Sequence, residues 1–490
     1  MTRWFVLVVI IALTCAACGS TANLTGLSVT GQPQSSATAA TATTEPGVTS
    51  TTTPITSAGA APSSNAATAA PSGGPVSAAA IAGEATNVAS AADNTGTGVT
   101  ATTISLGVDT YCSATLSTDS AAGIKGVPTL TGQQLYTAMI NYVNAHGGIA
   151  GRKVTPVIYQ ECGTYSQQAI CAAFTQDNHV FAIISDESHF DGTLLSCLTP
   201  VGVPLVNDFE GIYDQDMIDG STSGFYLPDM ISGQRLVSDW IPGLQSQGYF
   251  GSSPKVGLLS VDDPIYEKVQ AGVGPALQAA GYSLAATEDI SITDESTAAQ
   301  EIDSAVLNFK QQGIDHVLIM DDGAELTYLF GEAAESQNYY PRLGLNSINV
   351  PQLVADNVPA KALAGAVGVG WVPQIDVNTP PDSNTAAVNQ CVSIYAAEGI
   401  SLSGPNNATV ALLACSLVLF FKAAFEGATS ISAAGFRGGV EKLGTSYQSP
   451  YTFDTTFGPN RYDGASAYRG FSFSTSCSCF QYTTAVEGLR

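Results

Sequence analysis

Charged side chains are scarce in this sequence, and basic ones are the scarcest. Asp, Glu, Lys and Arg make up 12% of the 490 residues, about half of their share in an average soluble domain. The chain has 16 Lys and Arg against 41 Asp and Glu, which gives a net charge of −25. Binding to nucleic acids or to acidic membranes depends on clusters of basic residues, so neither is an expected partner. A strongly acidic surface mainly keeps a protein soluble.

Motifs of common enzyme classes are also missing. The sequence has no GxSxG, P-loop or HExxH motif, and no CxxC after residue 18, so nothing points to a nucleophile elbow, a phosphate cradle or a zinc site. Ser188, His189 and Asp191 could suggest a catalytic triad, but neighbours in sequence rarely face one another as nucleophile and base. Asp262 and Asp263 would need another carboxylate roughly 5 to 9 Å away to cleave a glycoside. We expect no enzyme, catalytic residue, metal or cofactor, and an exported hydrolase is the less favoured alternative.

Residues 1–18 have the layout of a signal peptide. Arg3 is followed by the apolar run WFVLVVIIAL at 4–13. A helix of this length rises about 15 Å, roughly half of a bilayer's hydrocarbon core, so it would target the chain without spanning the membrane. The AAC at 16–18 resembles the lipobox of bacterial lipoproteins, although Cys15 stands where a lipobox usually has Leu. We expect Cys18 to be lipidated; a plain secretory signal is the alternative.

From 19 to 99 the sequence consists mostly of Thr, Ser, Ala, Pro and Gly. Such a composition buries too little apolar surface to offset the entropy of ordering, so we expect a disordered tether. As a flexible coil it would span on the order of 50 Å. The remaining chain is too long for one ordinary core. We expect a first lobe at 100–226, a second lobe at 227–365, and a returning segment at 366–490 that packs mainly on the first lobe.

Short apolar strands alternate with amphipathic helices along this remainder. A strand at 101–110 precedes a helix at 129–148, in which Thr131 and Gln134 can form a capping box. The alternation restarts after Gly251 with KVGLLS. This pattern indicates parallel sheets covered by helices on both faces. The predicted fold class is α/β, with two doubly wound parallel-sheet lobes joined by a hinge.

Eight cysteines follow the tether: Cys112, Cys162, Cys171, Cys197, Cys391, Cys415, Cys477 and Cys479. An even number in an exported chain indicates disulfides, although eight cysteines allow 105 pairings. On a strand, Cys477 and Cys479 would point to the same face, and we expect each to pair with a distant cysteine. Cys415 lies in the apolar run VALLACSLVLFF, which is also compatible with an unpaired buried residue.

One run is typical of a known family. AMINYVNAHGGIAGRKVTPVIYQEC at 138–162 resembles the signature of periplasmic solute-binding proteins of the branched-chain amino-acid (Leu/Ile/Val-binding) type. Looser similarities occur in the same order as in the family, and the resemblance as a whole covers the chain from about 103 to its end. The resemblance implies the type I periplasmic-binding fold, in which two lobes joined by three hinge strands close on a small molecule. It also implies export, commonly as a lipoprotein, and an ABC transporter permease as the partner.

Ligands of open α/β sheets lie at the carboxyl ends of the strands. The loops expected there hold the candidate ligand-binding residues: Ser188, His189, Asn207, Tyr266, Asp321, Asp322 and Asn346. The resemblance assigns Ser188 to a ligand carboxylate and Tyr266 to closure over the ligand. Relatives that bind α-amino acids usually have an acid at the position of Asn346 and a Thr near Gly211, and this chain has neither. Asp321 or Asp322 could supply the missing charge, but an acid after a strand is often a helix N-cap instead.

The sequence therefore predicts an extracytoplasmic, lipid-anchored solute-binding protein. It would capture a small polar ligand, amino-acid-like or amide-like, between its lobes and deliver it to an ABC importer. The alternative is a sensor of the same fold, which passes lobe closure to a membrane receptor.

Overall fold

The computed structural model describes residues 96–490 except 122, 163–165, 187–191, 209 and 379–385. Cys18, the expected signal peptide and nearly all of the expected tether lie outside the described residues. The same is true of two candidate ligand-binding residues, Ser188 and His189.

The first sheet has five parallel strands in the order β2-β1-β3-β4-β5. They are β1 (Thr103–Tyr111), β2 (Lys153–Glu161), β3 (Ala182–Ser185), β4 (Leu205–Asn207) and β5 (Phe225–Tyr226). The helices between them are α1 (Ser113–Ala121), α2 (Gly132–Ala145), α3 (Gln167–Cys171, continued by a π-helical turn at Ala172–Asp177), α4 (Thr193–Val201) and α5 (Gln215–Gly220). The predicted capping box is confirmed at the start of α2, where Thr131 and Gln134 satisfy each other's backbone N–H groups.

The second sheet has eight strands, seven of them in the order β12-β11-β10-β9-β8-β6-β7. Strands β6 to β10 pair in parallel, and β11 and β12 are antiparallel additions at one edge. The strands are β6 (Val256–Val261), β7 (Leu284–Ile290), β8 (His316–Ile319), β9 (Arg342–Asn346), β10 (Val367–Gly370), β11 (Ala467–Ser474), β12 (Cys479–Tyr482) and β13 (Glu487–Gly488), which pairs with β11. The helices are α6 (Gly233–Ser246), α7 (Pro264–Gln270), α8 (Val273–Ala279), α9 (Glu295–Gln312), α10 (Glu325–Ser336), α11 (Pro351–Asn357) and α12 (Pro373–Asp376), with a 3-10 turn at Ser347–Asn349.

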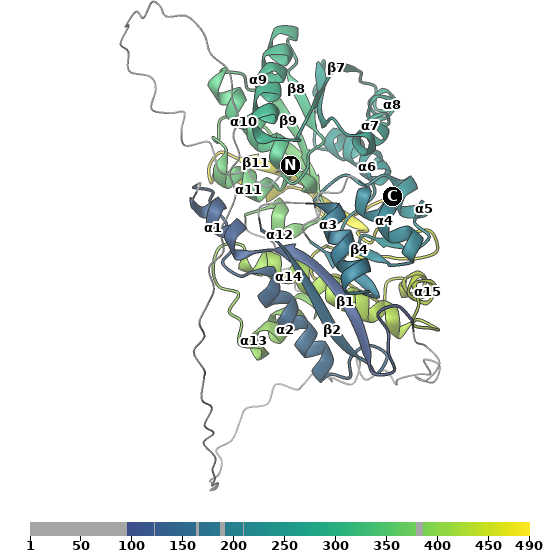
Figure 1. Cartoon of the computed structure of the whole chain (residues 1–490). Helices are drawn as coiled ribbons and strands as arrows, with labels where there is room; N and C mark the ends of the chain where they lie inside the picture. The colour runs from purple at the N-terminus through teal and green to yellow at the C-terminus, as the bar shows by residue number, and fades with distance from the viewer. Residues whose placement is uncertain (1–95, 122, 163–165, 187–191, 209, 379–385) are drawn as a thin grey trace, which may run out of the picture. The chain divides into compact units, whose positions relative to one another are not determined.

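The returning segment contributes strands to the second sheet and helices that pack beside the first. Its strands β10, β11 and β12 belong to the second sheet, so the boundary expected at 365 does not coincide with the edge of that sheet. Its helices are α13 (Ala386–Ala397), α14 (Asn407–Glu426) and α15 (Ala433–Leu443). Helices α13 and α14 lie beside α2, and α15 packs on α14 (Figure 1). We call the first sheet with α1–α5 and α13–α15 the first lobe, and the second sheet with α6–α12 the second lobe.

Helix α14 is the central helix of the first lobe's core. Within the described residues it alone is long and apolar enough to cross a membrane, yet 67% of its most apolar 18-residue window is buried inside the protein. The rings of Phe420 and Phe421 both lie against Phe436 of α15. A helix that is apolar on all sides can be buried in the core of a large domain, and the packing of α14 fits this description.

Four disulfides connect the eight cysteines of the described region. They are Cys112–Cys162, Cys171–Cys197, Cys391–Cys415 and Cys477–Cys479. One alternative is resolved and one expectation was wrong. Cys415 is paired, to Cys391 of the neighbouring helix, whereas Cys477 pairs with Cys479 rather than with a distant cysteine. The reason is that these two residues flank a tight turn between β11 and β12, where Ser478 has a φ of 51° and the cysteine Cα atoms are 5.2 Å apart.

Candidate functional site

The chain passes between the two lobes in three places within the described residues. The first crossover is 227–232 after β5, the second begins at 371 after β10, and the third is 444–466 before β11. The first and third are paired, since Leu227 N donates to Tyr462 O at 2.9 Å and Gly464 N donates to Leu227 O at 2.8 Å. Short connecting segments of this kind are where a hinge absorbs backbone rotation.

Tyr266 connects the lobes at the first turn of α7. This helix begins at Asp263, whose carboxylate accepts from Ile265 N, with Pro264 following as the first helical residue. The Tyr266 hydroxyl accepts from Ile212 N in the first lobe at 3.3 Å and donates to Asp321 O in the second at 3.1 Å. The side chain is only 2% exposed. Tyr266 therefore contacts both lobes, and its role over a ligand stays a prediction.

Further contacts hold the lobes together beside Tyr266. Gly323 N donates to Glu210 O at 2.8 Å, and the Lys268 ammonium lies 2.8 Å from a carboxylate oxygen of Asp214. Burial opposes ionisation of Asp214, but hydrogen bonds from Lys268, Gln234 and the N–H of Asp216, together with the charge of Lys268, outweigh it and lower the pKa of this carboxyl. The structure thus shows the lobes in contact on the side of Tyr266.

Asp321 is committed to the second lobe. Its carboxylate accepts from the backbone N–H groups of Asp322, Leu326 and Thr327 at 2.7 to 2.9 Å and from the Thr327 hydroxyl. Asn349 Nδ2 donates to the same carboxylate at 3.1 Å. Burial raises the pKa of Asp321, and these donors compensate the charge. Its contacts are those of a helix cap for α10 rather than of a ligand contact.

Asp322, the next residue, is buried at the contact between the lobes, with 6% of its surface exposed. After burial, its charge is the next largest cause that raises the pKa of Tyr266, and it also raises the pKa of Tyr213 in the first lobe. Asn207 donates to the Tyr213 hydroxyl through Nδ2 at 2.6 Å, and its Oδ1 has no hydrogen-bond partner among the described residues. Asn207, Tyr266 and Asp322 are therefore connected through Tyr213. Asn207 is hydrogen-bonded to Tyr213, and the charge of Asp322 acts on both Tyr213 and Tyr266.

Asn346 occupies the end of β9 and is fully buried. Its Oδ1 accepts from Ile348 N at 2.9 Å, and its own N–H donates to Asn349 Oδ1 at 2.6 Å. These two bonds form a capping box for the 3-10 turn. The Asn346 Nδ2 group has no partner in the described part of the chain, which leaves a buried donor for a ligand or a water molecule.

A small, partly open pocket lies beside the start of α10, in the second lobe. Its wall includes two residues that contact the first lobe, Gly323 and Asn357. Ala324 at one end of the pocket has a φ of 76°, and Val350 at the start of α11 has a φ of 41°. Backbone strain of this kind is concentrated at ligand sites. The lining residues are Gly323, Ala324, Glu325, Tyr328, Leu353, Val354 and Asn357.

A loop of the first lobe contacts the second lobe at the edge of this pocket. Lys125 N donates to Asn357 Oδ1 at 2.9 Å, and Asn357 Nδ2 donates back to Lys125 O at 3.2 Å. The Lys125 ammonium donates to Asp356 O at 2.9 Å. Asn406 connects the same elements, since it donates to Gly126 O and accepts from Gln352. The pocket therefore lies between two groups of contacts that join the lobes.

The match to known families agrees with this geometry. Residues 126–469 match the family model described as periplasmic binding protein. The chain belongs to this family. It is a solute-binding protein with the type I periplasmic-binding fold, as the sequence predicts, and the family is one of binding proteins rather than of enzymes. No curated protein sequence matches the chain, and no cluster of metal-binding side chains occurs within its described residues.

Solved structures of transporter substrate-binding proteins share the fold of this periplasmic binding protein. One is the Leu complex of an ABC transporter substrate-binding protein from Desulfitobacterium hafniense, with a TM-score of 0.54, 14% identity, and coverage of 78% of this chain and 100% of the other. Another is a fatty acid ABC transporter substrate-binding protein from Thermomonospora curvata, with a TM-score of 0.58, 16% identity, and coverage of 80% and 94%. A third is an ABC transporter solute-binding protein from R. palustris with bound 4-hydroxybenzoate, with a TM-score of 0.57, 12% identity, and coverage of 79% and 96%. These ligands differ in chemistry, so the fold alone does not specify one.

Sequence reasoning missed several residues of this binding protein's site. Glu210 lies in a loop that the strand pattern placed correctly, but nothing in the sequence distinguishes it from its acidic neighbours. The sequence predicts a helix near 326–336, where α10 lies, but not that Glu325 and Tyr328 line a pocket. The contact between Lys125 and Asn357 joins residues 232 positions apart, and no local pattern predicts it.

Proposed function

We propose that the protein is anchored by a lipid on Cys18, holds a small solute in the pocket of its second lobe beside the contacts with the first lobe, and delivers it to an ABC importer. The observation that carries this proposal is the position of the pocket. Its wall includes Gly323 and Asn357, and both residues bond to the first lobe. Because a solute bound here lies against those contacts, its binding and the closure of the lobes would favour each other.

The lining of the pocket favours a solute with an apolar body and a neutral or cationic polar end. Tyr328, Leu353 and Val354 supply apolar surface, Asn357 supplies an amide, and Glu325 supplies a carboxyl group. No lysine or arginine is among the lining residues that the structure describes. The N-terminus of α10 would otherwise attract an anion, but the carboxylate of Asp321 already occupies its N–H groups.

A thermal-shift screen with matched compounds that share an isobutyl group tests this proposal. The set is 3-methylbutylamine, 3-methylbutanamide, leucinamide, leucine and 3-methylbutanoate. We expect the amine and the two amides to stabilise the protein and the carboxylate to have no effect. A compound at 100 times its dissociation constant adds about 2.7 kcal/mol, a rise of a few degrees in a protein of this size.

Variants assign the site of binding. Glu325→Gln should weaken binding of the amine more than binding of the neutral amide. Glu332→Gln, on the same helix but outside the pocket lining, should change the binding of neither compound. Tyr266→Phe removes the hydroxyl that connects the lobes and should weaken every bound compound without lowering the melting temperature of the free protein. Stabilisation by 3-methylbutanoate alone would refute the assigned ligand class, and no response to any compound would count against the proposed solute class as a whole.

The lipid anchor has its own test. In cells that express the full chain and are fed a labelled fatty acid, the label should appear on the protein and the protein should remain in the membrane fraction. Cys18→Ser should abolish the label and release the protein, whereas Cys15→Ser should leave both unchanged. Equal labelling of the Cys18→Ser variant would favour a plain secretory signal.

A further inference from the structure

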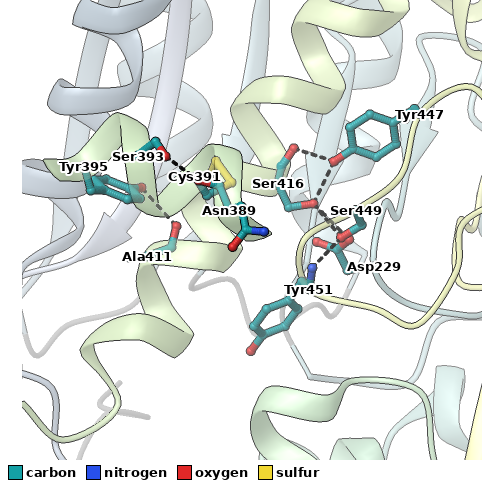
Figure 2. Close-up of a disulfide and its surroundings, with 11 residues drawn as sticks. Asp229, Asn389, Cys391, Ser393, Tyr395, Ala411, Ser416, Tyr447, Ser449 and Tyr451 are labelled. Atoms are coloured by element: carbon teal, nitrogen blue, oxygen red, sulfur yellow. Dashed lines mark hydrogen bonds between the residues drawn. A yellow bond between two sulfur atoms is a disulfide. The ribbon is translucent and has the colours of Figure 1, made fainter. Parts of the chain in front are cut away.

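A buried polar network joins two of the crossovers to α14. Asp229 of the first crossover is fully buried, and its Oδ1 accepts from the Ser416 hydroxyl at 2.9 Å. The hydroxyl groups of Tyr447 and Ser449, both in the third crossover, lie 2.8 and 3.0 Å from the same Ser416 oxygen. Figure 2 shows these four side chains converging from three segments of the chain. The network therefore lies in the hinge region.

The network continues from the hinge to the pocket. Tyr451 N donates to Ser449 Oγ at 2.8 Å, and the Tyr451 hydroxyl donates to Glu210 Oε1 at 3.3 Å. The carbonyl oxygen of Glu210 accepts from Gly323 N, across the contact between the lobes. Gly323 lines the pocket. An unbroken series of contacts thus runs from the hinge through Glu210 to the pocket wall.

The carboxyl groups of this network are pushed toward their neutral forms. Burial is the largest cause that raises the pKa of Glu210 to about 7; the charge of Asp229 contributes to the rise, while hydrogen bonds, including the one from Tyr451, act against it. Burial is also the largest cause of the raised pKa values of Asp208 and Asp229, whose carboxyl groups act on each other. These three acids, Asp208, Glu210 and Asp229, interact electrostatically with one another and with three tyrosines. The groups come from the loop after β4 and from the first and third crossovers, and the tyrosines are Tyr213, Tyr447 and Tyr451.

We infer that closure of the lobes is coupled to protonation of Glu210, so that the closed form, and with it solute capture at the proposed pocket, is favoured at low pH. The statement about solute capture rests on the proposed function, whereas the coupling of lobe closure to protonation does not. Opening the lobes breaks the bond between Gly323 and Glu210 and admits water to the carboxyl group. The charged form of Glu210 is then no longer penalised by burial.

The direction of the pH dependence follows from the two forms. The pKa of Glu210 is about 7 in the closed form and returns toward the ordinary 4.5 when the lobes open. Glu210 therefore keeps its proton to higher pH in the closed form than in the open form. The resulting stabilisation of the closed form is complete below pH 4.5 and is lost as the pH rises through about 7. The ratio of closed to open protein should fall about tenfold between pH 6 and pH 8.

A distance measurement without any solute tests this coupling. Nitroxide labels on Asn141→Cys in α2 and Ser304→Cys in α9, both exposed, report lobe separation in the full chain by pulsed electron spin resonance. We expect the closed fraction to decrease from pH 5.5 to 8.5 with a midpoint near 7. Glu210→Gln should remain equally closed at every pH. Tyr451→Phe, which removes a bond that lowers the pKa of Glu210, should move the midpoint to higher pH.

Glu441→Gln is the matched control, because Glu441 also accepts a tyrosine hydroxyl, from Tyr462 at 2.7 Å. It should keep the pH profile of the parent. A closed fraction that does not change with pH in the parent, or an unaltered profile in Glu210→Gln, would overturn the inference. Since no solute is present, either result would leave the solute-binding proposal to the thermal-shift screen.

Discussion

Replacing Asp321 with alanine should lower the free energy of unfolding of the second lobe by about 4 kcal/mol, because it leaves several buried donors unpaired at once. The carboxylate accepts from Leu326 N and Thr327 N at the start of α10 and from Asn349 Nδ2 of the adjoining 3-10 turn. Alanine offers none of these donors an acceptor. Urea unfolding followed by tryptophan fluorescence measures the effect, since Trp240 and Trp371 are both buried in the second lobe.

Asp262 provides the control for this prediction. It follows β6 as Asp321 follows β8, but it is exposed, so Asp262→Ala should change the stability by less than about 0.5 kcal/mol. Asp321→Asn keeps one acceptor oxygen and should fall between the two. If Asp321→Ala instead left stability unchanged and removed solute binding, the residue would be a ligand contact, as the sequence first suggested.

The sequence predicted the fold because the fold depends on local patterns. The capping box of Thr131 and Gln134 marks the start of α2, and the alternation of apolar strands and helices is sufficient to indicate a covered parallel sheet. It also located the loops at the strand ends. The role of each acid within those loops depends on neighbours from elsewhere in the chain. Asp321 is a cap because Asn349 and α10 lie next to it, and the pKa of Glu210 is raised because the fold buries its carboxyl group near Asp229.

The cysteines show the same limit. The spacing of Cys477 and Cys479 excludes a bond between them on a regular strand, and only the turn at Ser478 brings them within reach. Cys415 lies in a run so apolar that a buried free thiol was an equally good interpretation. Its pairing depends on where α13 packs, and that packing is determined by the first lobe as a whole.

Removing the disulfide between α13 and α14 should have the second large effect. In Cys391→Ala with Cys415→Ala, we expect a loss of about 3 kcal/mol, because the bridge closes a loop between residues 24 positions apart and so restricts the unfolded chain. The melting temperature of the first lobe should fall by roughly 10 °C in a calorimetric scan. Both cysteines are fully buried, so repacking around the alanines adds to the loss.

The double variant Cys477→Ala with Cys479→Ala separates chain restriction from the loss of a disulfide as such. That bridge spans only two positions, so the same relation predicts about half the effect, and it should appear in the second lobe because the turn lies between β11 and β12. Equal losses from the two variants would show that the α13–α14 bridge acts through local packing. If the loss in the Cys391→Ala, Cys415→Ala variant is confined to the first lobe, then α13 and α14 unfold together with the strands near residue 100, although they come late in the sequence. The hinge would then separate two cooperative units.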